Sequence, residues 1–468
     1  MGGLVGWGSP ADAAGPSVQT AGGADRGGAL PTLVLALASA LHGLAASSVV
    51  CSVPAIAATL HVTHGAELVV AVFFLGAGLG VLLGGRVADV VGPRWLLLAG
   101  LGAVVMASCL AAVAPSFATL LLARGVLGAA TASLCPAAIA LLGSRNIAAG
   151  KPTTWGLAVI VTMSEVAFGM GPALGAAISI SVGWRAGSAL LAPLAAVLFV
   201  LAWRILPKPA DGAASVEVVR RLDLAGVVLG VSGAAVGLTL LAVPPYLFSG
   251  SVILPTVLGA LVAAVIVHAL RRGDDGFLDV RLLCSSPIAL GLGRVAATSF
   301  GVYAVMFGLP LWAASALRWS PLEIGVALVP VAVVAAISVV LCRGMLRRRG
   351  PDAPIRIGVV GLAGTGAAVV ALLVWPHGAM VELAAVMVGV TCGANYLATQ
   401  HGSVAASPPS RLGGVASWSR FVQFASGQAA SLALLVVRPG TTIGLLAIAA
   451  GVALSSVALV FTCCFPRR

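Results

Sequence analysis

The sequence predicts an all-α polytopic membrane protein, and two features carry that prediction. Hydrophobic runs of about 18 to 28 residues recur along nearly the whole chain, separated by short Gly/Pro-rich or Arg-rich breaks. Charged residues make up only 9% of the 468 positions, and the mean hydropathy is +1.11. A hydrocarbon core about 30 Å thick requires roughly 20 apolar residues per crossing. Because backbone N–H and C=O groups must be paired inside lipid, each long run is expected to cross the membrane as a helix.

The breaks between apolar runs predict fourteen transmembrane helices. Several of them are crowded with Gly and Ala, which permits close and mobile contacts between helices. The expected spans are 32–58, 67–85, 95–113, 117–142, 155–182, 186–206, 223–246, 251–270, 286–314, 322–342, 355–375, 380–402, 412–437 and 441–464.

The two longest charged segments divide the chain into two halves. They bracket the seventh and eighth spans, which suggests six helices, an inserted pair, and six more helices. We therefore expect a disordered cytoplasmic tail over 1–31, a six-helix bundle over 32–206, cytoplasmic loops with two inserted helices over 207–285, and a second six-helix bundle with a short tail over 286–468.

The net charge of +12 is interpreted as a topology signal. With the N-terminus in the cytoplasm, 20 of the 26 Lys and Arg residues fall in the tails and cytoplasmic loops, and only Arg185, Arg318 and Arg438 lie outside. Such an excess on one side follows the positive-inside rule. The sequence therefore predicts a multi-pass protein of the cell membrane with both termini in the cytoplasm.

Composition and motifs argue against other classes of protein. The basic residues form no face alternating with aromatics, so no nucleic-acid partner is expected. The sequence contains no GxxxxGK[ST], HExxH or GxSxG motif and no Cys/His cluster with metal-ligand spacing. We expect no enzyme activity, cofactor or metal site. No soluble association motif is visible either, and the chain is expected to be a monomer in the bilayer.

A short motif separates the second and third spans. Gly85 and Gly92 permit a tight cytoplasmic turn, and Asp89 can pair with a basic group or a helix N-terminus in one conformation only. Arg94 ends the motif. A second copy at 344–351 joins the tenth and eleventh spans without the acidic residue. Equivalent loops in two halves favour a duplicated transporter.

The segment 85–94 resembles the G-x-L-A-D-x-x-G-R-R loop of the major facilitator superfamily. Further stretches resemble the fourteen-span drug:proton antiporters of that superfamily. They are the R-x-x-x-G pattern of Arg124 and Gly128, the antiporter G-P-x-x-G motif at Gly171, Pro172 and Gly175, the Gly183-Trp184-Arg185 turn, the 311–330 segment and 414–417. The resemblance implies two six-helix bundles with two extra central helices, alternating access, and efflux coupled to proton entry.

The first span departs from that family. An acidic residue is expected within it, and Ala45 occupies the corresponding position. Coupling through the usual group is therefore in doubt, and other titratable residues become candidates.

Three residues are candidates for proton coupling. Glu165 is the only carboxylate deep within a span and shares a helix face with Gly169 and Pro172. An ion at that depth requires a partner, a water-filled cavity or protonation. Arg124 in the fourth span can pair with Glu165, either as a coupling element or as a permanent structural pair. His42, one turn before Ala45, can titrate near neutral pH in place of the missing acid, or simply be a packed core residue.

Two further arginines lie inside spans. Arg294 and Arg420 enter at similar depth from the cytoplasmic side, and they either face a shared cavity that attracts an anionic head group or extend to the interface. Tyr303, Asn395 and Gln423 suit the wall of a cavity for an amphiphilic substrate, although ordinary helix packing also explains them.

These observations favour a secondary transporter that exports a small hydrophobic or amphiphilic compound in exchange for protons. The missing acid of the first span leaves open an uncoupled metabolite exporter or uniporter. A non-transporting membrane receptor or assembly partner is the alternative from another class.

Overall fold

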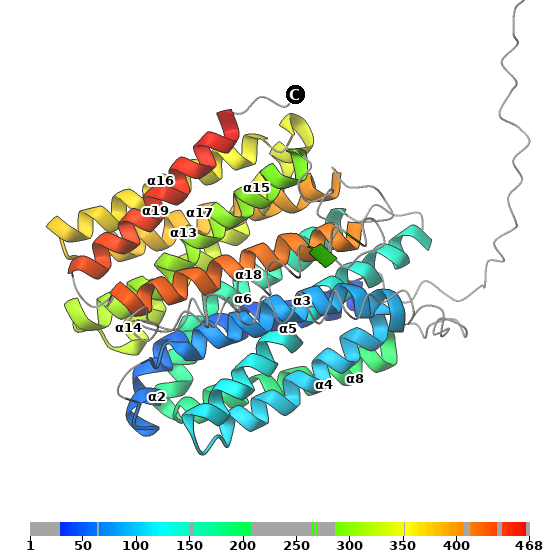
Figure 1. Ribbon diagram of the computed structural model, residues 1–468, viewed down its shortest axis with the longest axis horizontal. Coiled ribbons are helices and arrows are strands. Elements are labelled where there is room, and N and C mark those ends of the chain that lie inside the picture. Colours follow the sequence, from blue (N-terminus) through cyan, green and yellow to red (C-terminus); the bar gives the residue numbers. More distant parts are fainter. Residues whose placement is uncertain are drawn as a thin grey trace, which may run out of the picture.

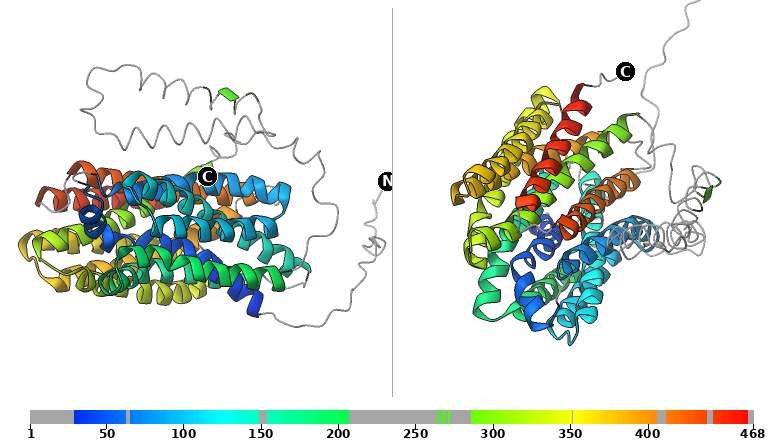
Figure 2. Two further views of the ribbon diagram at one scale, coloured as in Figure 1. Left: turned by 90° about the horizontal axis from the view of Figure 1, so that it is seen from below. Right: turned by 60° about the vertical axis from the view of Figure 1, so that its left-hand side comes forward.

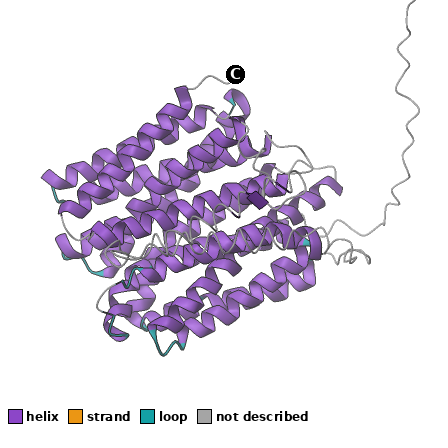
Figure 3. Cartoon of the chain, in the orientation of Figure 1, coloured by secondary structure: helices purple, strands orange, loops and turns teal. Residues whose placement is uncertain are grey.

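The computed structural model describes residues 29–62, 65–148, 154–206, 286–350, 352–405, 412–437 and 442–464, with a few isolated residues between 264 and 271. The described part is helical throughout, joined by short turns (Figure 3). Ten of its helical segments are long and apolar enough to cross a membrane, and Leu68–Gly84 is a shorter apolar helix. The predicted span 223–246 and all but a few residues of the predicted span 251–270 lie outside the described residues, so the fourteen-span count stays a prediction.

The first half has helices at the six positions where spans are expected before the insert. The first span is broken into α1 and α2, since a 3-10 turn, η1, precedes Pro54 near the start of α2. The elements are α1 (Ala29–Ser47), η1 (Val50–Ser52), α2 (Val53–Thr59), α3 (Leu68–Val91), α4 (Pro93–Ala112), α5 (Phe117–Ala148), α6 (Thr154–Ser181), α7 (Trp184–Ala189) and α8 (Leu191–Ile205).

The second half has helices at the six positions where spans are expected after the insert. The short α14 begins at a capping box, in which the Ser320 hydroxyl accepts from the Glu323 backbone N–H while the Glu323 carboxylate accepts from the Ser320 backbone N–H. The elements are α13 (Ser286–Ala316), α14 (Pro321–Ala327), α15 (Val329–Arg349), α16 (Asp352–Val374), α17 (Gly378–Ala405), α18 (Leu412–Val437) and α19 (Thr442–Cys464).

The helices of each half pack together, and the two sets of contacts are equivalent. In the first half α3 and α4 both pack on α5, and α4 also packs on α8; in the second half α15 and α16 pack on α17, and α16 packs on α19. Between the halves, α3 packs on α18 and α6 packs on α15. These two pairs are equivalent when each helix is replaced by the corresponding helix of the other half. Figures 1 and 2 show the long helices running side by side in this arrangement. The pairing is that of two repeats related by a pseudo-two-fold axis.

The turn after α3 and the turn after α15 are alike, as the two copies of the motif predict, but the first turn is shorter than predicted. Gly92 joins α3 to α4 with φ 90°, and Gly350 follows α15 with φ 74°, so both turns adopt a left-handed backbone that favours glycine. The loop predicted over 85–94 is much shorter than expected, because α3 continues to Val91 and only Gly92 leaves the helix. Asp89 is therefore part of the helix backbone.

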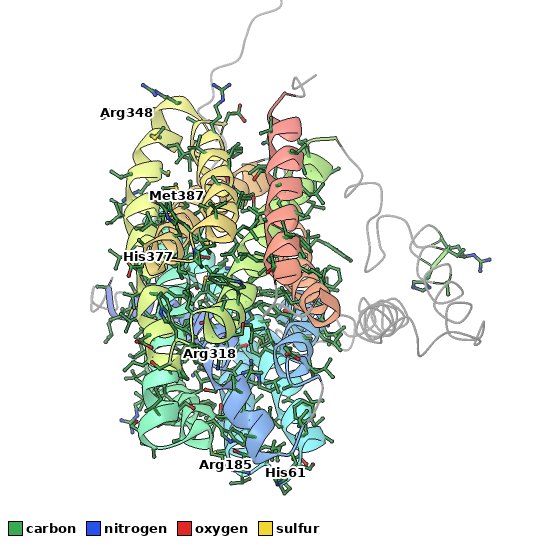
Figure 4. All side chains as sticks on the ribbon, turned by 90° about the vertical axis from the view of Figure 1, so that its left-hand side faces the viewer. His61, Arg185, Arg318, Arg348, His377 and Met387 are labelled. Atoms are coloured by element: carbon green, nitrogen blue, oxygen red, sulfur yellow. The ribbon has the colours of Figure 1, made fainter. Side chains whose placement is uncertain are left out.

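Alternating helix directions place the odd-numbered connections of each half at one end of the bundle. Figure 4 looks onto this end and labels His61, Arg318 and His377, which lie in three of these connections, and Arg185, which follows the connection before α7. We call it the outer end, following the orientation predicted from the basic residues.

Glycines allow the closest helix contacts in the first half. A Cβ atom at Gly80 of α3 would overlap the backbone carbonyl of Ala129 in α5, and one at Gly128 would overlap the carbonyl of Phe73. A Cβ atom at Gly102 of α4 would meet no atom within 4 Å. The small residues thus set the α3–α5 separation at specific points.

This contrast predicts the effect of two matched substitutions. Gly80→Ala should destabilise the protein by roughly 1–3 kcal/mol, because the added methyl forces two backbones apart. Gly102→Ala should be neutral or slightly stabilising, since alanine favours a helix interior by about 1 kcal/mol over glycine. Thermal unfolding of the two purified variants in detergent checks this, and equal melting temperatures would show that the α3–α5 contact is not tight.

Candidate functional site

A cavity lies between the two halves near the middle of the helices. It has an empty volume of about 860 Å³, any open solvent included, and helices of both halves line it. Polar and aromatic groups predominate among its larger side chains. The lining consists of Ser39, His42, Gly43, Ala132, Cys135, Ser164, Glu165, Phe168, Val295, Thr298, Ser299, Val302, Tyr303, Cys392, Asn395, Arg420, Gln423 and Phe424.

Glu165 is the only acidic residue in this lining, and it is 9% exposed. It lies eleven residues into α6, roughly 16 Å along the helix at about 1.5 Å per residue. Its carboxyl is hydrogen-bonded to the thiol of Cys392 in α17. Glu165 thus belongs to the first half and has a polar partner in the second.

Arg420 of α18 is the cationic residue of the cavity. Its guanidinium donates to Gln423 Oε1 at 3.1 Å within its own helix. It also donates to the Cys135 sulfur of α5 at 3.1 Å, in the opposite half. Arg420 and Glu165 therefore place opposite charges around one cavity, and each reaches across the boundary between the halves.

His42 lies on the α1 side of the cavity. Its Nδ1 is 3.0 Å from the Thr131 hydroxyl. The ring stacks on Phe73 with centroids 5.3 Å apart and packs at 4.5 Å against Phe424 of the second half. Nε2 is buried and has no hydrogen-bond partner among the described residues. His42 is thus both a packed aromatic residue and a lining residue with an available ring nitrogen.

An aromatic and amide wall completes the site from the second half. Tyr303 packs edge-on against Phe168 of α6 with centroids 5.6 Å apart, and its hydroxyl accepts from Gln423 at 3.5 Å. Asn395 of α17 donates to the Thr298 hydroxyl of α13 at 3.1 Å. The cavity therefore combines apolar surface, hydrogen-bonding groups and both signs of charge, the lining expected for an amphiphilic ligand.

The expected pairing of Arg124 with Glu165 is wrong. Arg124 donates through Nη1 to the carbonyl of Ala45 at 2.9 Å and through Nε to the carbonyl of Val69 at 3.2 Å. Its guanidinium also lies 4.5 Å from the ring of Phe73. The side chain leaves α5 on the face toward α1 and α3, nearer the outer end than the cavity. Cys392 and Arg420 occupy the neighbourhood in which Arg124 was expected.

Arg294 does not line the cavity. Its Nη1 lies 3.9 Å from the carboxylate of Asp352, the first residue of α16, and that carboxylate is half exposed. The interface interpretation thus describes Arg294, whereas Arg420 faces the cavity. Depth along a helix is similar for both residues, but they point to different surroundings.

The glycine motif of α6 forms helix contacts toward the outer end. A Cβ atom at Gly171 would overlap the Ser47 hydroxyl, and one at Gly175 would overlap the Ser48 carbonyl, so α6 packs closely against the end of α1. Pro172 lies within α6 between them. The motif therefore positions the helix that carries Glu165, and it is not itself part of the cavity lining.

Arg94, the last residue of the 85–94 motif, is buried at the other end of the first half. It donates to the backbone carbonyl of Trp203 at 2.8 Å, and its guanidinium lies 5.7 Å from the ring of Trp95 and 5.4 Å from that of Trp203. It thereby ties α4 to α8 within one half. The side chain of Asp89 lies outside the described residues, so its latch role remains a prediction.

Two cavity residues escaped the sequence interpretation. Cys135 and Cys392 were not among the residues singled out from the sequence, yet they contact Arg420 and Glu165 across the two halves. Their sequence context offers a weak signal: Cys392 lies one helical turn before Asn395, and Cys135 precedes Pro136 inside α5.

Two helical repeats around a central cavity with mixed charge define a polytopic membrane transporter. The chain belongs to the Major Facilitator Superfamily, whose family model matches residues 35–432. As a member of that family it transports small molecules across a membrane and is not an enzyme.

Known relatives include drug-resistance and export proteins. The puromycin resistance protein pur8 of Streptomyces alboniger is 28% identical over 81% of this chain and 76% of its own length. The multidrug resistance protein B homolog of Mycobacterium tuberculosis is 27% identical over 60% of this chain and 51% of its own length. The cephamycin export protein CmcT of Amycolatopsis lactamdurans is 33% identical over 34% of this chain and 31% of its own length. The match with the mycobacterial protein thus spans about half of that relative.

Proposed function

We propose that this protein exports a small amphiphilic compound from the cytoplasm in exchange for protons. The observation that supports the proposal best is Glu165, a buried carboxyl in a cavity between the two halves. Burial favours the protonated form of a carboxyl, whereas a nearby guanidinium favours the charged form. A group subject to both influences can exchange its proton when access or a ligand changes.

Alternating access would proceed by movement of one half against the other. The contacts of Glu165 with Cys392 and of Arg420 with Cys135 each join opposite halves. Protonation of Glu165 removes a negative charge from the boundary, and a ligand that engages Arg420 competes with its present partners. Proton binding and substrate binding would thus shift the boundary between the two halves toward opposite conformations, as exchange requires.

We place the protein in the cell membrane as a monomer of fourteen spans with both termini in the cytoplasm. The basic residues support this orientation, because the outer end carries few of them. In this arrangement the cavity is loaded from the cytoplasm and emptied outside. The 207–285 segment would supply the inserted pair of spans.

An uncoupled exporter is the second candidate, and Ala45 is the observation that favours it. The family resemblance places an acidic residue here, while this chain has a buried alanine whose carbonyl accepts a hydrogen bond from Arg124. If no other group replaces the missing acid, substrate moves only down its own gradient.

Flux measurements on the purified full chain in proteoliposomes separate these candidates. Suitable probes are puromycin, which carries an amine, and a cephamycin, which carries a carboxylate, because relatives of the chain are named for these compounds. We expect a pH gradient to drive accumulation of at least one probe above equilibrium, with simultaneous proton flux reported by an entrapped pH dye. Equilibration that is indifferent to the gradient would favour the uncoupled exporter, and binding without flux would favour a receptor.

A further inference from the structure

A second, smaller cavity lies within the first half toward the outer end. Its empty volume is about 390 Å³, any open solvent included, and it is lined by the α1–α2 segment, α4, α5, α7 and α8. Arg124 lines it, together with the hydroxyl residues Ser48, Ser52 and Ser188. It shares no lining residue with the central cavity. A ligand here would be separate from the transported substrate.

Arg124 carries a buried positive charge that the protein only partly accommodates. The residue is 4% exposed. Two backbone carbonyls and the Phe73 ring engage the guanidinium, but Nη2 is buried and has no hydrogen-bond partner among the residues that the structure describes. In the described part of the chain no carboxylate lies within 4.0 Å of it, and Glu67 at the start of α3 forms no ion pair with it. The two carbonyls offset part of the cost of burying this cation, but no carboxylate of the described residues balances its charge.

Ala45 lies next to Arg124 but carries no negative charge. Its carbonyl accepts the Nη1 hydrogen bond of Arg124 at 2.9 Å, so the backbone of residue 45 lies beside the guanidinium. The methyl group cannot provide the negative charge that a carboxylate would. The neighbouring cavity contains hydroxyl groups that can donate hydrogen bonds to an anion.

We propose that this cavity binds a small monovalent anion of the chloride type, which replaces the missing carboxylate as the counter-ion of Arg124. The anion is held by the guanidinium and by the hydroxyls of Ser48 and Ser52. It stabilises the contacts among α1, α3 and α5 and is not carried across the membrane. This role does not depend on the identity of the substrate or on proton coupling.

Thermal unfolding of the purified full chain tests this proposal without any transport assay. In sodium chloride the melting temperature should exceed that in sodium gluconate of equal ionic strength by about 2 °C or more, and the shift should saturate with concentration, as expected for a ligand of the native state. Arg124→Gln should lose this shift. Arg94→Gln is the matched control, because Arg94 is also buried and stacked on aromatic rings but lies at the other end, and it should keep the shift.

A second variant restores the carboxylate in place of the anion. Ala45→Asp should be insensitive to chloride and as stable in gluconate as the wild type is in chloride, whereas Ala45→Asn should remain sensitive. If Arg124→Gln does not fold, binding of radiolabelled chloride to the wild type and to Ala45→Asp decides the question. Equal melting temperatures of the wild type in both salts, or chloride binding undiminished in Ala45→Asp, would overturn the proposal.

Discussion

Glu165→Gln should abolish accumulation driven by a pH gradient while leaving downhill exchange of substrate intact. Glutamine imitates the protonated carboxyl in size and lacks a titrating group, so a proton can no longer be loaded or released at this position. Because a side-chain amide still fills the contact with Cys392, the two halves keep a polar connection. We expect concentrative uptake to fall at least tenfold, and exchange of labelled for unlabelled probe in proteoliposomes to stay within about threefold, roughly 0.7 kcal/mol.

Glu382→Gln is the matched control for this variant. Glu382 is also a carboxylate within a spanning helix, but it is exposed near the start of α17 and lies outside the cavity lining. Its substitution should leave both assays unchanged. If Glu165→Gln still concentrates substrate when driven by pH, then His42 becomes the coupling candidate or transport is uncoupled. Loss of both assays together would instead indicate a structural role for Glu165.

The helices could be predicted from the sequence almost completely within the described residues. The run at 412–437 has the same bounds as α18, and most other spans begin and end within a few residues of the predicted positions. The reason is physical. The thickness of the bilayer sets a minimum length for each apolar run, and lipid offers no hydrogen-bond partners, so the backbone of each run must pair with itself as a helix. The exceptions are α3, α5 and α15, which end at Val91, Ala148 and Arg349, beyond the predicted ends at 85, 142 and 342. In α3 the helix continues through the polar motif. Polarity marks the membrane boundary, whereas the helix ends where Gly92 changes the backbone.

The partners of the buried charges could not be predicted in the same way. Depth along a helix indicates the level of a residue in the membrane but not which neighbour it faces. Arg124 and Glu165 were expected to meet because both lie inside adjacent spans, yet one faces α1 and α3 and the other faces α17. The pairings of Glu165 and Arg420 with cysteines of the opposite half depend on how the two halves assemble. No local pattern in either half contains that information.

Arg420→Gln should weaken binding of an anionic ligand at least tenfold and leave a neutral ligand nearly unaffected. Arg420 is the cationic side chain in the lining of the central cavity, and its guanidinium already holds Gln423 and Cys135 at hydrogen-bond distance. A hydrogen bond to a charged group contributes about 1.5–3 kcal/mol, which corresponds to roughly a tenfold to hundredfold change in affinity. Quenching of tryptophan fluorescence by a cephamycin, compared with a neutral amphiphile, measures the difference.

Arg294→Gln provides the contrast that the sequence alone could not. Both arginines enter their spans at similar depth, and both were candidates for the same cavity. In the structure Arg294 lies at the half-exposed Asp352 and outside the lining, so its substitution should change neither affinity by more than about twofold, or roughly 0.4 kcal/mol. Arg420→Lys keeps the charge but loses the planar fork and should fall between the wild type and Arg420→Gln. If Arg420→Gln weakens binding of anionic and neutral ligands equally, the residue only holds the two halves together through Cys135. If Arg294→Gln has as large an effect as Arg420→Gln, the anion-binding surface lies elsewhere.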